Sequence, residues 1–188
     1  ADGITNTDLG SRDMGYSITS LPNQYVLLVG ESGWGVGIVK YSPDGQLDST
    51  FGQGGKVVLS NFSHSEVIKV VTATDGKIFI GSDTNSGSSR DFSIIKLNSN
   101  GSIDTTYANQ GRVSFDFNGR NDYLSDLIFS PDGKIYLTGS TSGDFSALRI
   151  NANGSLDTTF GTNGQVVTDL GGSDDTSTSA ALQDDGKL

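Results

Sequence analysis

The chain has 188 residues, of which 34% are hydrophobic and 26 are glycine, and it contains no cysteine. The lack of cysteine excludes disulfides, thiolate zinc sites and a cysteine nucleophile. The net charge of −10 argues against nucleic acid and anionic lipid as partners, because an anionic surface repels both. No run of residues reaches the roughly 18–20 apolar residues of a membrane span, so we expect no membrane insertion.

Short β-branched or aromatic runs recur along the chain and are bounded by glycine-rich turns. Such runs predict strands, and no segment has the 3.6-residue period of an amphipathic helix. Turns of the type Ser-Pro-Asp-Gly, at 42–45 and 130–133, favour hairpins between sequential strands. In chain order the predicted strands are Tyr25–Gly30, Val36–Tyr41, Lys56–Leu59, Glu66–Thr72, Lys77–Gly81, Phe92–Leu97, Arg112–Phe115, Ser125–Ser130, Lys134–Gly139, Phe145–Ile150 and Gln165–Thr168.

Two motifs recur at a fixed spacing. The first, which we call the LD phrase, reads GQLDSTFG at 45–52, GSIDTTYA at 101–108 and GSLDTTFG at 154–161. Its aliphatic residue lies at 47, 103 and 156, so the period is 56 and then 53 residues. The second motif is the tripeptide DGK at 75–77, 132–134 and 185–187. Self-similarity at this period predicts an array of one supersecondary unit.

Four antiparallel strands in about 50 residues predict an all-β fold, a β-propeller-type array of four-stranded antiparallel blades. We expect a single array with units at 1–52, 53–108 and 109–161 and a partial unit at 162–188, about three and a half repeats. Propellers close with about four to eight blades. We therefore expect either a piece of a longer propeller, which we favour, or completion by a second copy of the chain. Open strand edges would invite such pairing.

From the LD phrase to DGK, the segment 154–187 resembles the delta-60 repeat family of bacterial, mostly secreted or surface, proteins. Two motifs in the same order carry the resemblance, which extends along the whole chain. Departures are Tyr107-Ala108 in place of Phe-Gly and Asn23-Gln24-Tyr25 in place of DGK. The resemblance implies propeller-like blades and no common activity. A composition rich in Ser, Thr, Asn, Asp and Gly but poor in Lys also favours an extracellular or cell-surface location.

A charged pair recurs in register within the repeat. It consists of Asp48, Asp104 and Asp157 in the LD phrase, and Lys40, Lys96 and Arg149 in the preceding strand. A calcium loop of the EF-hand type would put Lys96 at the first ligand position and Tyr107 at the last, where oxygen ligands and a bidentate glutamate are required. We therefore expect the aspartates to be structural, capping turns and pairing with the basic residues.

Other carboxylates gather in loops, along 116–126 and near residues 174 and 184. Because hard cations take oxygen ligands, Asp174 and Asp175 are candidate calcium ligands, and calcium is the one cofactor we consider. We find no copy-to-copy spacing that supports a shared acidic site. His64 is the only histidine, and the sequence places no catalytic partners beside it, so we expect no enzyme activity.

Alternate turns of a four-stranded meander lie at the same edge of the sheet. The LD phrases and the short turns would then share one edge, and the loops that differ between copies would share the other. Variable loops on a rigid scaffold are where binding residues tend to lie. Trp34 either offers a stacking surface or folds over its own strand to cover Gly35 and Gly37. The candidate ligand-binding residues in these loops are Arg12, Trp34, His64, Arg90 and Arg120.

These patterns predict a non-enzymatic, extracellular or surface repeat scaffold that mediates protein binding or adhesion. One alternative is a glycan-binding or glycan-active propeller portion, in which Trp34 and loop acids line a pocket. A glycosidase would need two carboxyl groups roughly 5–10 Å apart across a cleft. A further alternative is a structural assembly subunit that uses its open strand edges to form homo-oligomers.

Overall fold

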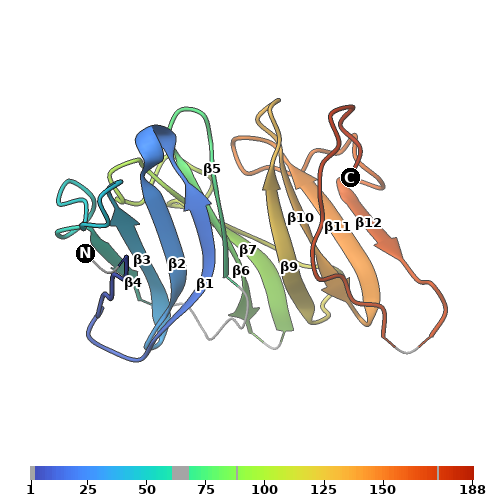
Figure 1. The fold of residues 1–188 in the computed structure, drawn as a ribbon. Coiled ribbons are helices and arrows are strands. Elements are labelled where there is room, and N and C mark those ends of the chain that lie inside the picture. The colour runs from blue at the N-terminus through green and yellow to red at the C-terminus, as the bar shows by residue number, and fades with distance from the viewer. Residues whose placement is uncertain (1–2, 61–67, 88, 173) are drawn as a thin grey trace.

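The chain folds into three four-stranded antiparallel sheets that stand side by side (Figure 1). This computed structural model describes residues 3–60, 68–87, 89–172 and 174–188. Each sheet is a meander whose strands pair in sequence order. The strands are β1 (Asp13–Ser20), β2 (Val26–Ser32), β3 (Gly35–Tyr41) and β4 (Lys56–Leu59) in the first sheet, β5 (Ile68–Thr72), β6 (Ile78–Ser86), β7 (Ser89–Leu97) and β8 (Arg112–Phe115) in the second, and β9 (Asp122–Phe129), β10 (Ile135–Thr141), β11 (Asp144–Ile150) and β12 (Gln165–Thr168) in the third.

The predicted all-β, propeller-type array is confirmed, and the three sheets do not close into a ring. The first strand of the second sheet, β5, contacts the first strands β1 and β9 of its two neighbours, whereas the short last strands contact mainly their own sheet. This is the arrangement of propeller blades, whose first strands lie nearest a common axis. Apart from a single 3-10 turn, η1 (Pro22–Gln24), the described residues contain no helix, and none that is long and apolar enough to cross a membrane.

The second sheet is the middle layer, and its strands supply the core on both sides. Side chains alternate between the faces of a strand. Ile80 and Ile95 accordingly pack against the first sheet, whereas Phe79 and Ile94 pack against the third. All four side chains are at most 2% exposed. The continuous apolar runs of these strands thus reflect burial on both faces, which replaces the alternation of apolar and polar residues typical of a sheet with one solvated face.

The strand after each LD phrase completes the preceding sheet and does not begin the next one. β4, β8 and β12 pair with β3, β7 and β11, which precede the phrase. The sheets therefore span 13–59, 68–115 and 122–168, and the unit boundaries drawn after residues 52, 108 and 161 fall inside them. The reason is that the phrase is a tight reversal: the amide of Phe51 donates to Asp48 O, and that of Gly55 donates to Phe51 O.

The turn before each second strand closes in the same way in every copy. Its glycine has a φ of 81° in Gly76 and 84° in Gly133, a region that favours glycine. In the first copy Gln24 occupies this position with a φ of 64°, and the turn still closes through an amide hydrogen bond from Leu21 to Tyr25 O. The same turn is present at Gln183–Lys187, as expected for the start of a fourth unit.

The N-terminal segment lies against the outer face of the first sheet. The hydroxyl of Tyr41 donates to Thr7 Oγ1 over 2.6 Å, and a Cβ added to Gly37 would lie 2.5 Å from Leu9 Cδ1. Leu9 therefore packs where the sheet has no side chain of its own. This end of the array is therefore covered in part by the chain itself.

The C-terminal segment covers the other end of the array in a similar way (Figure 1). The Ser125 hydroxyl donates to Ser177 O over 2.6 Å, and the Ala180 amide donates to Asp126 Oδ2 over 3.0 Å. These contacts place residues 177–180 beside β9, where the first strand of a further sheet would lie.

Candidate functional site

The LD aspartate of the second copy closes its own turn and binds two lysines. Asp104 Oδ1 accepts hydrogen bonds from the amide and the hydroxyl of Thr106, at 3.3 and 2.6 Å. Its Oδ2 lies 3.1 Å from Lys77 Nζ and 3.6 Å from Lys96 Nζ. The Thr106 hydroxyl and then Lys77 lower the pKa of Asp104 to about 2, against the opposing effect of burial. Lys77 is the lysine of the DGK tripeptide, so the two repeated motifs form one charged network.

The third copy repeats this network with an arginine. Asp157 Oδ2 lies 2.7 Å from Lys134 Nζ and 2.8 Å from Arg149 Nε, and Oδ1 accepts both hydrogen bonds from Thr159. The Lys134 hydrogen bond is the main reason that the pKa of Asp157 lies well below its usual range. A carboxylate with these donors has no oxygen left for calcium.

The first copy shows what replaces the DGK lysine. Asp48 Oδ2 lies 2.8 Å from Lys40 Nζ, and the Lys40 hydrogen bond, followed by that of Thr50, lowers the pKa of Asp48 to about 2. Tyr25 stands where the other copies have the DGK lysine, and the Lys40 ammonium lies 4.8 Å from its ring centre. A cation–π contact thus takes the place of the second ion pair.

The aromatic residue of the LD phrase joins neighbouring sheets. Phe51 is 1% exposed, and a Cβ added to Gly101 of the next sheet would lie 3.0 Å from its ring. A Cβ added to Gly154 would likewise lie 2.9 Å from the Tyr107 ring. The amide of Gly52 also donates to Asn100 O across the two sheets, over 2.8 Å. The edge with the LD phrases is therefore structural. The residues that repeat along it join neighbouring blades.

Replacing Tyr107 by phenylalanine is expected to stabilise the protein. The Tyr107 hydroxyl is buried without a hydrogen-bond partner, and burial raises its pKa well above the usual range. Removing an unsatisfied buried hydroxyl should add about 1 kcal/mol to the free energy of unfolding, or about 2–4 °C in the melting temperature. Tyr136→Phe is the matched control, because the Tyr136 hydroxyl accepts a hydrogen bond from Arg149 at 3.2 Å and its loss should destabilise. A lower melting temperature for Tyr107→Phe would contradict this account.

The candidate residues of the variable loops lie at the opposite edge, in two separate places. Arg12 and Trp34 lie together at the first sheet, where the Gly33 amide donates to Arg12 O over 3.0 Å. Trp34 is 77% exposed, and Leu9 covers Gly37, so Trp34 does not fold over its strand to cover that glycine. His64 lies outside the described residues.

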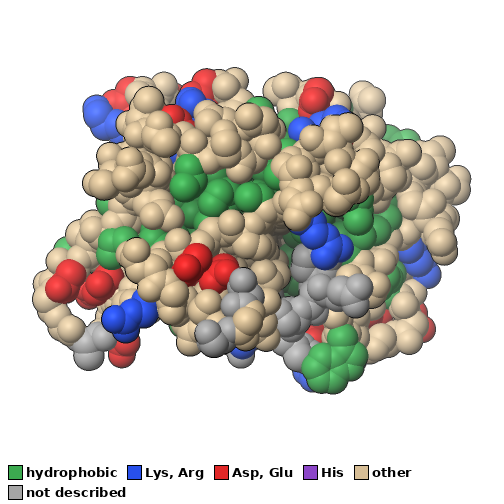
Figure 2. All heavy atoms as spheres, turned by 180° about the vertical axis from the view of Figure 1, so that it is seen from behind, with side chains coloured by type: hydrophobic (Ala, Val, Ile, Leu, Met, Phe, Trp, Pro, Cys, Tyr) green, Lys and Arg blue, Asp and Glu red, His purple; other side chains and the backbone are tan. Residues whose placement is uncertain are grey.

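Arg90 and Arg120 each line a hollow that Tyr123 also lines, near the joint of the second and third sheets. The Arg90 guanidinium lies 5.7 Å from the Tyr123 ring centre and forms an ion pair with Asp83 at 3.2 Å. Tyr123 is 46% exposed. A shallow hollow of about 450 Å³ has Arg120 and Tyr123 in its wall, and a second one of about 270 Å³ has Arg90 and Tyr123. In Figure 2 charged side chains gather mostly along the two loop edges, whereas the band between them is largely apolar.

The sequence reasoning missed Tyr123, because it fell in a segment taken as a loop. β9 begins at Asp122, three residues before the predicted start at Ser125, and so includes this tyrosine. The residues before Ser125 are mostly polar and typical of turns, so the sequence indicated a loop. The aromatic side chain of Tyr123 was the one feature that could have marked it as a candidate.

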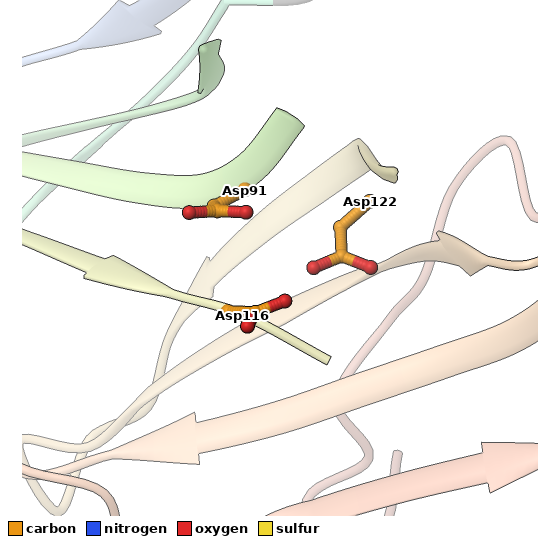
Figure 3. A group of neighbouring side chains, drawn as sticks. All are labelled: Asp91, Asp116 and Asp122. Carbon is orange, nitrogen blue, oxygen red and sulfur yellow. The ribbon is translucent and has the colours of Figure 1, made fainter. Parts of the chain in front are cut away.

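Two groups of three carboxylates occupy the same place in consecutive copies. One oxygen from each of Asp91, Asp116 and Asp122 (Figure 3) lies within 4.8 Å of the others, and the three oxygens of a second group are equally close. Each member of the second group follows its counterpart by 53 residues, the spacing of the LD phrases. The expectation that no copy-to-copy spacing supports a shared acidic site is therefore wrong. The second group consists of Asp144, Asp169 and Asp175.

The candidate Asp175 thus belongs to a group, whereas its neighbour Asp174 does not. Asp175 Oδ2 accepts the Leu170 amide at 2.8 Å, just as Asp122 Oδ2 accepts the Phe117 amide at 2.9 Å. In both copies the loop therefore places one particular aspartate, Asp122 or Asp175, beside two other carboxylates. The sequence alone does not show which of the adjacent residues Asp174 and Asp175 has this position.

The first group, which we call the acidic triad, is unusually buried. Asp122 is 0% and Asp91 4% exposed, whereas Asp116 is exposed. Asp122 Oδ1 has no hydrogen-bond partner, and no described lysine or arginine lies within 4.0 Å of the three carboxylates. Burial first, and then the neighbouring Asp116 and Asp91 charges, raise the pKa of Asp122, while the nearby Thr141 hydroxyl lowers it less. Carboxylates placed in this way can share a proton or ligate a hard cation.

The three open sheets and their shared charged network define a β-propeller-type repeat protein. Three segments, at residues 26–51, 73–107 and 130–160, match the family described as "Domain of unknown function (DUF5122) beta-propeller". Each match runs from the beginning of the second strand of a sheet, or the turn before it, into the LD phrase. Three segments of the chain are therefore similar to this β-propeller repeat. A comparison with curated proteins found no match.

Proposed function

We propose that this chain is a non-enzymatic repeat scaffold, outside the cell or at its surface, that binds a protein or a glycan through its variable-loop edge. The observation that carries the proposal is that Arg90 and Arg120 line two shallow hollows that share Tyr123, at the joint of two sheets. Arginine beside an exposed aromatic ring is a combination enriched where proteins bind partners. The rigid LD edge on the far side supports this assignment, because it leaves the loops free to vary.

The charge distribution favours a partner that carries carboxylates. The chain has a net charge of −10, yet Arg120 lies at one of the two hollows, and Arg90, which is paired with Asp83, lies at the other. A guanidinium binds a carboxylate through two parallel hydrogen bonds, a geometry available to acidic side chains and to acidic sugars. An acidic peptide segment or an acidic glycan therefore fits this edge.

The carboxylates support a non-enzymatic scaffold. The acidic triad brings three carboxylates together at this edge, but Asp91 and Asp122 are at most 4% exposed. A glycosidic bond must lie between the two catalytic carboxyl groups. A sugar has no access to two such buried groups without displacement of the loop 116–121.

Glycan binding without hydrolysis is the second candidate, and the exposure of Trp34 favours it. An indole ring that is 77% exposed at a loop tip offers a flat surface for a sugar ring. Assembly through open strand edges has less support, because the outer strands β4, β8 and β12 are four residues long, and short edge strands limit edge pairing.

The test compares binding of labelled protein to an array of neutral and acidic glycans and to immobilised cell-envelope proteins. We expect Arg120→Ala and Tyr123→Ala each to weaken binding roughly tenfold, as for a residue at an interface hot spot. Val167→Ala is the control, because this side chain is 48% exposed but lies on β12 and lines neither hollow. Loss of a glycan signal on Trp34→Ala alone would favour the second candidate. Binding that neither loop variant affects would contradict the proposed edge.

A further inference from the structure

We propose that the acidic triad of Asp91, Asp116 and Asp122 binds one calcium ion between the second and third sheets. The group at Asp144, Asp169 and Asp175 would bind a second ion, one repeat further along the chain.

The geometry suits a single hard cation. The oxygens of Asp91, Asp116 and Asp122 lie within 4.8 Å of one another, and their carboxylates face a common space (Figure 3). An ion with calcium–oxygen distances of about 2.4 Å can contact oxygens this far apart. Magnesium requires shorter distances and a near-ideal octahedron, and zinc prefers nitrogen and sulfur ligands. Calcium also accepts water and hydroxyl oxygens, which would complete its six to eight ligands.

The orphaned oxygen of Asp122 points to a ligand. Asp122 is 0% exposed, its Oδ2 is held by the Phe117 amide at 2.9 Å, and its Oδ1 has no hydrogen-bond partner. The Thr141 hydroxyl, on the residue paired with Asp122 in β10, is the one neutral side chain that favours the charged form of Asp122, and it does so less than burial opposes it. Buried polar atoms are normally satisfied, so the Oδ1 of Asp122 beside two further carboxylates indicates an incomplete coordination shell.

A comparison with the LD aspartates strengthens the argument. Asp104 and Asp157 are buried as deeply as Asp91, at 5–6% exposure, and each is paired with two basic side chains. The described part of the chain supplies no such cation to the acidic triad. Buried carboxylates are neutralised by a proton or by a compensating charge, and a cation from solution would supply that charge here.

The triad also spans a joint between sheets. Asp91 lies in β7 and Asp116 follows β8, whereas Asp122 begins β9 of the next sheet. An ion held by all three would therefore fix the third sheet to the second. The joint between the first two sheets lacks this site, because the positions 56 residues earlier are Gly35 and Ser60.

The experiment measures thermal unfolding and calcium binding in the chelator-treated protein. We expect 10 mM calcium to raise the melting temperature by about 3–8 °C, and an equal concentration of magnesium to raise it much less. Titration calorimetry should show two sites with dissociation constants of about 10⁻⁴–10⁻³ M, the range of extracellular modules. An unchanged melting temperature together with the absence of binding heat would overturn the proposal.

Variants separate a metal site from a merely structural cluster. Asp116 and Asp169 are exposed, so Asp116→Asn and Asp169→Asn should fold, and each should remove one calcium site. Asp184→Asn, an exposed aspartate outside both groups, is the control and should keep both sites.

Asp122→Asn should have effects of opposite sign in the two conditions. Without calcium it should raise the melting temperature, because it removes a buried charge from beside two others. With calcium it should lose the stabilisation that the ion gives at this site. If Asp116→Asn keeps the full calcium response, or if calcium stabilises Asp122→Asn as much as the wild type, the assignment is wrong.

Discussion

An alanine at Gly139 is expected to lower the melting temperature by roughly 6–12 °C. Gly139 lies in the middle of β10, and a Cβ at this position would be 2.0 Å from Tyr123 O and 2.7 Å from Phe92 Cζ. The first of these atoms belongs to the backbone of β9, which moves only if the strand pairing is disturbed. Overpacking of this kind costs about 3 kcal/mol.

The glycine is needed because β9 comes unusually close there. The register between β9 and β10 shifts at Thr138 and Gly139, which is the mark of a bulge. Gly30 occupies the same position in the first sheet, where a Cβ would lie 1.8 Å from Met14 O.

Gly172→Ala is the matched control for Gly139→Ala. Both glycines have φ values that other residues adopt, and no atom lies within 4 Å of a Cβ added at Gly172. This control should melt at the wild-type temperature or slightly above it. Equal melting temperatures for Gly139→Ala and the wild type, measured by circular dichroism, would show that the close approach of β9 does not exist.

The substitution Asp104→Ala is expected to reduce the free energy of unfolding by about 2–4 kcal/mol at pH 7. It leaves Lys77 and Lys96 without their shared carboxylate and removes both hydrogen bonds to Thr106. The binding of a partner at the variable-loop edge should persist, because the LD phrase lies at the opposite edge. Urea unfolding at constant ionic strength measures the loss, and Asp184→Asn should show none.

The difference between Asp104→Ala and the wild type should shrink in acid. The pKa of Asp104 is lowered from 3.8 to about 2, so the folded state binds the proton less well than the unfolded state. The carboxylate therefore contributes its full stability above about pH 4, and this contribution is lost as the pH falls toward 2. A difference in stability that stays constant between pH 5 and pH 2 would contradict an ionic role for Asp104.

Much of the scaffold could be predicted from the sequence, because each of its features is local or repeated. The last strand of each sheet, as in Lys56–Leu59, is bounded by turn residues and was predicted with the bounds that the structure has. The structural role expected for Asp104 also agrees with its contacts, since Lys96 at the first position of a calcium loop left little else possible. The role of Lys77 was missed, because its partner lies 27 residues further along the chain.

The features that depend on contacts between distant segments could not be predicted. The strand after an LD phrase can pair with the preceding or with the following sheet, depending on the direction in which the chain reverses at the phrase. The sequence repeats with the same regularity in either case, so it does not show which pairing occurs. The acidic triad escaped notice because its members are spread from residue 91 to residue 122 and recur in only two copies. A search for single aspartates recurring at 53 residues would have found Asp91 with Asp144, but not their nearness to Asp116.

The phase between LD phrases and sheets has a consequence for how such a gene can grow. A duplication that runs from one LD phrase to the next does not add a free-standing blade. Each added copy gives its first strand to the sheet before it, as β8 is given to the second sheet, and receives its own last strand from the copy that follows. Neighbouring copies therefore share sheets, and selection on the sequence of one copy acts on two sheets.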